Sequence, residues 1–168
     1  MDLKIQKKDG FTPQIGQLVS MMEYARNTTL WAVEGLTIEQ LDYLPYEGSN
    51  SIGALLLHMA AVERYYQIDT FEKREPTLKE LEELKLGLEL GDEARIHVKG
   101  NPLSFYLDKL ATVRSATLEE FRKRDDEWLN SEVMWGKDSA NHYFLWFHVF
   151  EDELNHRGQI RILKKMQK

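Results

Sequence analysis

Three residues near the C-terminal end have side chains that can bind metal ions: His148, Asp152 and His156, spaced four residues apart. On an α-helix this spacing places all three on one face, with a drift of about 40° at each step. Large apolar side chains lie between them, so the segment is predicted to be a helix that packs against the rest of the protein. The three polar residues on this face indicate either a metal site or a solvated polar stripe.

The rise of a helix limits which of these residues can share one ion. His148 and His156 are separated by about 12 Å along the axis, which is too far for two bonds of about 2.1 Å to one metal. Neighbours four residues apart, at about 6 Å, can converge. His58 lies within the apolar stripe, residues 52–66, of another predicted helix that runs from Ser51 to about Phe71. We therefore expect His58 to complete a site with either Asp152 and His156 or the pair one turn earlier, leaving positions open for water and substrate.

Each of these residues also has a purely structural interpretation. A histidine inside an apolar stripe is often a hydrogen-bonded core residue. A ferritin-like di-iron site is disfavoured, because it needs two Glu-x-x-His motifs and further glutamates. Glu153-x-x-His156 is one such motif, but Leu55 stands where His58 would need its glutamate. The sequence contains no Ser/His/Asp nucleophile pattern and no glycine-rich phosphate loop.

The composition limits the class of protein. The chain has 168 residues, of which 42% are hydrophobic and 30% are charged, as expected for a single globular domain over residues 1–168. Its net charge of -6 argues against a nucleic-acid partner. The longest apolar run, residues 52–62, is shorter than the ~20 residues that cross a bilayer, so no membrane association is expected. Without cysteines or an evident secretory signal, we expect a cytoplasmic protein whose reactive thiol, if any, comes from a cosubstrate.

Four long helices with apolar residues at three- and four-residue spacing are predicted to position these side chains. Their starts are marked by Thr12-Pro13, Ser51, Asn101-Pro102 and Asp138 or Ser139. The helices are predicted to end near Gly35, Phe71, Arg124 and the C-terminus. A capping-box pattern at Thr37 and Gln40 predicts one short helical turn after the first long helix.

Two connections complete the prediction. Residues 77–90 are rich in Leu, Glu and Lys and indicate one or two short surface helices in a long crossover between the second and third helices. Residues 125–137 form a connection that could be partly extended, although no Asn-Gly or Asp-Gly hairpin turn is present between alternating apolar runs. The expected fold is all-α: a four-helix bundle with a crossover that contains short helices.

Two segments of the chain resemble the DinB/YfiT-like superfamily of four-helix-bundle, metal-dependent proteins. They are residues 51–66, which contain His58, and residues 148–160, in which His156 is followed by Arg-Gly-Gln. The resemblance implies His58 as the first metal ligand and His156 as the last. Asp152 stands where the usual pattern has its middle histidine. A carboxylate is a competent ligand there and would shift the preference toward Zn²⁺, Fe²⁺ or Mn²⁺.

Characterised members of this superfamily include S-transferases and isomerases that use low-molecular-weight thiols, and they often form homodimers. The resemblance therefore implies a metal-dependent thiol S-transferase or hydrolase acting on a small-molecule substrate. A divalent Zn, Ni, Fe or Mn ion would activate water or a low-molecular-weight thiol. The alternative is a non-enzymatic, stress-related helical bundle in which the same residues form a buried polar network or a vestigial metal site.

Three further residues are candidates for supporting roles. Glu63 follows His58 by five residues, and His148 precedes Asp152 by four. Both are expected to hydrogen-bond the ligands or to transfer protons. Arg157 could orient Asp152, bind an anionic substrate or form a surface ion pair.

Overall fold

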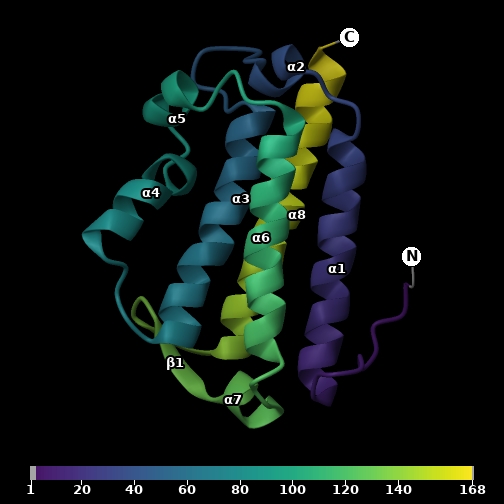
Figure 1. Ribbon diagram of the computed structural model, residues 1–168, viewed down its shortest axis with the longest axis vertical. Coiled ribbons are helices and arrows are strands. Elements are labelled where there is room, and N and C mark those ends of the chain that lie inside the picture. The colour runs from purple at the N-terminus through teal and green to yellow at the C-terminus, as the bar shows by residue number, and fades with distance from the viewer. Residues whose placement is uncertain (1–2, 168) are drawn as a thin grey trace.

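A computed structural model describes residues 3–167 as a bundle of four long helices that lie side by side (Figure 1). These helices are α1 (Pro13–Val33), α3 (Ile52–Gln67), α6 (Leu103–Phe121) and α8 (His142–Met166). Helix α3 packs against both α6 and α8, and α1 packs mainly against α8. The predicted four-helix bundle is confirmed.

Short helices occupy the connections, as predicted for the crossover. They are α2 (Ile38–Asp42), α4 (Leu78–Leu88), α5 (Asp92–His97) and α7 (Asp126–Asn130). Helix α4 packs against α3 on the outside of the bundle, and α5 and α2 lie near one end of it (Figure 1). Capping boxes at Thr37 with Gln40 and at Thr77 with Glu80 begin α2 and α4, so local sequence sets both starts.

The starts of the long helices use different caps. Ser51 accepts a hydrogen bond from the Ala54 N–H and so caps α3, as predicted. Helix α1 begins at Pro13, as predicted, but its first free N–H groups are bound by Asp126 of α7 instead of the Thr12 side chain. A carboxylate at a helix N-terminus is also favoured by the helix dipole. Helix α6 begins one residue later than predicted, with Pro102 as its cap.

The region before α8 differs from the prediction. Strands β1 (Glu132–Trp135) and β2 (Asp138–Asn141) pair antiparallel, with Trp135 opposite Asp138. Because residues 138–141 pair with β1, the last helix cannot begin at Asp138 or Ser139 as predicted. Asn141 caps α8 instead, by accepting the Phe144 N–H. The hairpin and α7 lie at the end of the bundle opposite α2 (Figure 1).

The end of the second long helix also has a special geometry. Helix α3 ends at Gln67 and continues as a π-helical turn, η1 (Ile68–Glu72). Lys73 follows in the left-handed region with φ of 53° and ends the turn. The chain therefore stays helical to Glu72, close to the predicted end near Phe71, although the α-helix itself ends at Gln67.

The apolar core has two parts. The first includes Leu55, Leu56, Met59, Tyr106, Leu110 and Ile160. The second includes Ile15, Met22, Phe121, Trp146 and Phe150. Along each long helix, a buried charged residue lies between these two clusters: Arg26, Glu63, Arg114 and Glu153. In the part of the chain that the structure describes, no helix has both the length and the apolar character needed to cross a membrane.

Candidate metal centre

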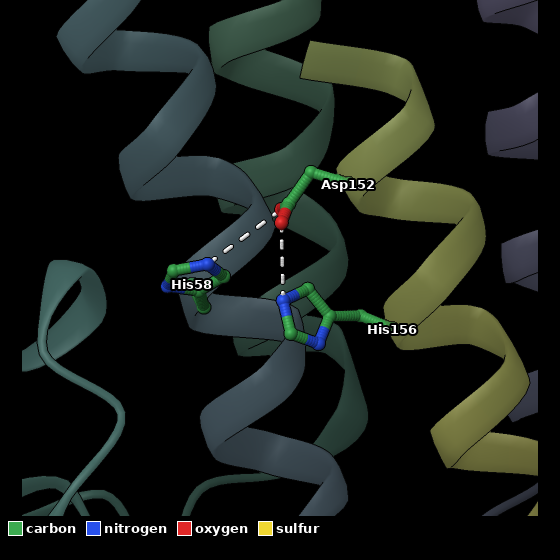
Figure 2. A group of neighbouring side chains, drawn as sticks. All are labelled: His58, Asp152 and His156. Carbon is green, nitrogen blue, oxygen red and sulfur yellow. Dashed lines mark ion pairs between the residues drawn. The ribbon is translucent and has the colours of Figure 1, made fainter. Parts of the chain in front are cut away.

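His58 of α3 meets Asp152 and His156 of α8 where these two helices face each other (Figure 2). The Nε2 atom of His58 lies 3.6 Å from Asp152 Oδ2, and the Nε2 atom of His156 lies 3.3 Å from Asp152 Oδ1. One potential ligand atom of each residue lies within 4.8 Å of those of the other two. The structure thus brings together His58 and the later of the two candidate pairs.

These separations match the ligand spacing of a metal site. Two ligand atoms that each bond one ion at about 2.1 Å with a tetrahedral angle lie about 3.4 Å apart. The two histidine–aspartate separations, 3.6 Å to Oδ2 and 3.3 Å to Oδ1, lie on either side of this value, and the three potential ligand atoms lie within 4.8 Å of one another. The ring centroids of His58 and His156 are 4.8 Å apart with an interplanar angle of 82°, so the rings approach from different directions. Three ligands of this kind leave at least one coordination position for water or substrate.

Hydrogen bonds on the far side of each ring set which nitrogen faces Asp152. His58 Nδ1 lies 2.8 Å from the carbonyl oxygen of Gly87, which can only accept, so Nδ1 carries a proton. His156 Nδ1 lies 3.3 Å from Oε1 of Gln159 and is paired in the same way. When the rings are neutral, their Nε2 atoms therefore present lone pairs to the carboxylate.

A proton or a cation between these side chains would offset the buried negative charge of Asp152. Asp152 Oδ2 is buried, and no described residue gives it a hydrogen bond. When both rings are neutral, each oxygen of the Asp152 carboxylate faces one imidazole lone pair, and this contact is repulsive unless a proton or a metal ion lies between the two groups. Two imidazoles and one carboxylate form a donor set suited to Zn²⁺, Fe²⁺, Mn²⁺ or Ni²⁺. The residues present therefore fit a divalent metal ion.

Protonation of the two α8 residues is coupled. Burial alone raises the pKa of Asp152, but the interactions with His156 and His58 outweigh it and hold this pKa well below its usual range. Burial alone lowers the pKa of His156, but the hydrogen bond and the charge of Asp152 outweigh it and raise this pKa above the ordinary 6.5. A metal that binds here has to displace a proton from His156 over a wider pH range than at an isolated histidine.

His148 lies outside the group of three, one helical turn before Asp152. Its Nδ1 atom is 3.1 Å from Oε2 of Glu151. Its ring contacts Tyr66 and Trp135, with centroid distances of 6.2 and 5.4 Å. The structure therefore places His148 beside the candidate metal centre in an aromatic surrounding.

Glu63 belongs to a different cluster. Its carboxylate is buried and accepts hydrogen bonds from Arg114 at 2.7 Å, Arg26 at 3.0 Å and Thr117 at 2.7 Å. The same arginines bind Glu153. Glu63 shares a helix with His58 and was predicted to support the metal ligands, whereas its side chain is directed to Arg26 of α1 and Arg114 of α6.

Arg157 is directed to α1 instead of to Asp152. Its Nη1 atom donates to the hydroxyl of Thr28, and its buried Nε has no hydrogen-bond partner among residues 3–167. Three residues were missed from sequence: Gly87, which pairs with His58, and Arg26 and Arg114, which bind Glu63 and Glu153. The available signal for the arginines was their position on otherwise apolar helical stripes, four residues after Met22 and Leu110.

Comparisons with known proteins agree with this architecture. A family model described as Mycothiol-S-transferase matches residues 17–167. Among solved structures, the chain is similar to the crystal structure of a conserved protein from Enterococcus faecalis, with a TM-score of 0.67 and 17% sequence identity over 89% of this chain and 94% of that one. At this identity the structural match supports the fold alone. No curated protein matches the chain.

Proposed function

Because the chain belongs to the mycothiol-S-transferase family, within the DinB-like superfamily, we propose that it is a metal-dependent thiol S-transferase. The divalent ion would be held by Nε2 of His58, Nε2 of His156 and the carboxylate of Asp152. The observation that carries this proposal is the approach of these three potential ligand groups to within 4.8 Å of one another, without a hydrogen-bond donor for Asp152 Oδ2 among the described residues.

The chemistry at such a centre would be the formation of a nucleophile. A bound divalent ion lowers the pKa of a coordinated thiol or water, so that the anion is available near neutral pH. The chain has no cysteine, and the thiol is therefore a cosubstrate. Asp152 supplies the negative charge that matches the cation. Gly87 and Gln159 accept the Nδ1 protons and so hold the two imidazole rings with Nε2 directed to Asp152.

His148 is the proposed proton acceptor for the incoming thiol. Its Nδ1 atom faces the carboxylate of Glu151, which accepts the Nδ1 proton. The Nε2 atom of the neutral ring then has a free lone pair and can take a proton. His148 lies one turn before Asp152 on α8, and its side chain is one-third exposed, so a cosubstrate can reach it.

Metal content and thiol transfer test the proposal separately. Protein purified without a histidine tag should bind about one equivalent of Zn²⁺, Mn²⁺, Ni²⁺ or Fe²⁺ per chain and gain thermal stability with it. Less than about a tenth of an equivalent, with no gain in Tm, would rule out the metal site and favour the non-enzymatic bundle.

The loaded protein should then couple at least one low-molecular-weight thiol to an electrophile such as monochlorobimane. The panel should include mycothiol, glutathione and free cysteine, with His156→Ala as the metal-deficient control. If the loaded protein binds metal but transfers no thiol, the transferase proposal is wrong and water as nucleophile, which means a hydrolase, becomes the alternative. We also propose a homodimer, which sedimentation velocity measures directly.

A further inference from the structure

The ligand histidine of α3 is joined to the crossover helix α4 by one hydrogen bond. His58 Nδ1 lies 2.8 Å from the carbonyl oxygen of Gly87, which is in the last turn of α4. The last carbonyl groups of a helix lack an N–H partner within the helix and carry the negative end of its dipole. This carbonyl is therefore free to accept the imidazole proton.

Only glycine allows the α4 backbone to come this close to α3. A Cβ atom at position 87 would lie 2.5 Å from the Cβ of Ala61 and 3.1 Å from the carbonyl oxygen of Leu57. Both atoms belong to the helix that carries His58, and the Leu57 oxygen is backbone that cannot turn aside. A larger residue at position 87 would push α4 outward and lengthen the hydrogen bond to His58.

Two acceptors compete for the single proton of a neutral His58. The Gly87 carbonyl is 2.8 Å from Nδ1, and Asp152 Oδ2 is 3.6 Å from Nε2. With the carbonyl in place, the proton stays on Nδ1 and Nε2 presents its lone pair. Without it, the carboxylate favours the proton on Nε2, and this atom can no longer bind a metal.

We propose that Gly87 is a positioning residue for the ligand atom of His58. Its missing side chain lets α4 approach α3, and its carbonyl keeps the proton off Nε2. The crossover helix is then part of the metal centre, although it contributes no ligand. This inference rests on the proposed metal site for its effect on affinity, whereas its effect on the His58 proton does not require a metal.

The direct test is the tautomer of His58 in metal-free protein. Long-range ¹H–¹⁵N spectra at about pH 8, where imidazoles are mostly neutral, distinguish a proton on Nδ1 from one on Nε2. The wild type should have the Nδ1–H form, and Gly87→Ala should shift His58 toward the Nε2–H form. An unchanged Nδ1–H form in Gly87→Ala would overturn the proposal.

Zn²⁺ affinity, measured by competition with a chelating dye, is the second readout. Gly87→Ala should weaken binding by about 10- to 100-fold, the usual effect of losing a hydrogen bond behind a ligand. Gly91→Ala is the matched control, because an added Cβ there meets no atom within 4 Å. Gly91→Ala should bind Zn²⁺ like the wild type.

A rescue variant separates a positioning role from a general loss of packing. Ala61→Gly in the Gly87→Ala background removes the closest clash. Compared with Gly87→Ala, the double variant should regain the Nδ1–H form of His58 and part of the Zn²⁺ affinity, with Ala61→Gly alone as the reference. No recovery in either readout would overturn the proposal. Failure of the wild type to bind any metal would instead overturn the proposed function, and the tautomer would still decide the role of Gly87.

Discussion

Glu63 of α3 and Glu153 of α8 are held by the same two arginines. Arg114 donates to Glu63 at 2.7 Å and to Glu153 at 3.3 Å, and Arg26 donates to each of them at 3.0 Å. Burial alone raises the pKa of Glu63, but Arg114 and Arg26 outweigh it and hold this pKa below its usual value. The two helices that carry the candidate ligands are therefore linked through charged groups of α1 and α6.

Replacement of Glu153 by glutamine should destabilise the protein strongly. The side chain keeps its size but loses the charge that offsets two buried guanidinium groups, and removal of one partner from a buried ion pair costs about 3–5 kcal/mol. Urea denaturation followed by circular dichroism measures the change in unfolding free energy. Glu151→Gln is the control, because Glu151 is a partly exposed neighbour whose loss should cost about 1 kcal/mol or less. Equal effects of the two variants would contradict this assignment.

His148 and His156 of α8 should differ in their effect on metal binding when each is removed. His156→Ala should abolish stoichiometric metal binding, because Nε2 of His156 is one of the three converging groups. His148→Ala should leave metal content unchanged, since its ring lies among Tyr66 and Trp135. Elemental analysis of both variants measures the metal content per chain. Loss of metal in His148→Ala alone would mean that the earlier pair, His148 with Asp152, holds the ion, and a similar loss in both variants would mean that the choice of the later pair is wrong.

Metal stabilisation should grow as pH rises. In metal-free protein, the lowered pKa of Asp152 gives stability that is present above about 3.8 and is lost as pH falls through the folded-state value. The raised pKa of His156 gives stability that is present below about 6.5 and is lost as pH rises through its folded-state value. The ion replaces that proton, so the gain in Tm with Zn²⁺ should increase between about pH 6 and pH 8. A gain that is largest at the acid end would contradict the prediction.

The identity of residue 152 should change the metal preference without removing the site. Asp152→His restores the residue of the usual superfamily pattern and should keep Zn²⁺ affinity within about 10-fold, because imidazole is also a competent ligand. Asp152→Ala should bind Zn²⁺ more than about 10-fold more weakly than the wild type, since only two ligands remain. Calorimetric titration with Zn²⁺ and the absorption spectrum with Co²⁺ test both statements. Tight binding by Asp152→Ala would show that the carboxylate is not a ligand.

The long helices and the group of three could be predicted because both depend on simple spacing. Apolar residues at three- and four-residue intervals mark the helices, and the rise per residue favours neighbours such as Asp152 and His156 over the outer pair. The hairpin could not be predicted in this way. Its turn at Gly136-Lys137 lacks the usual Asn-Gly or Asp-Gly signal, and its strands are mostly exposed, so they show no apolar alternation.

The charged cluster and the role of Gly87 depend on contacts between distant segments. The positions of Arg26 and Arg114 on apolar helical stripes indicate burial, but no local pattern shows that Glu63 and Glu153 lie opposite them. Gly87 looks like a helix-weakening residue in a connection. The role of Gly87 depends on the close approach of α4 to α3, which no local sequence pattern predicts.

The place of the charged cluster between the two apolar clusters also specifies how the helices align during folding. Apolar side chains can pack against different neighbours at similar free energy, so an all-apolar bundle tolerates a helix that slides by one turn, about 5.4 Å. Such a slide here would separate carboxylates from guanidinium groups and bury both unpaired, at a cost of several kcal/mol. We infer that one alignment is strongly favoured, and it is the alignment in which His58 faces Asp152 and His156.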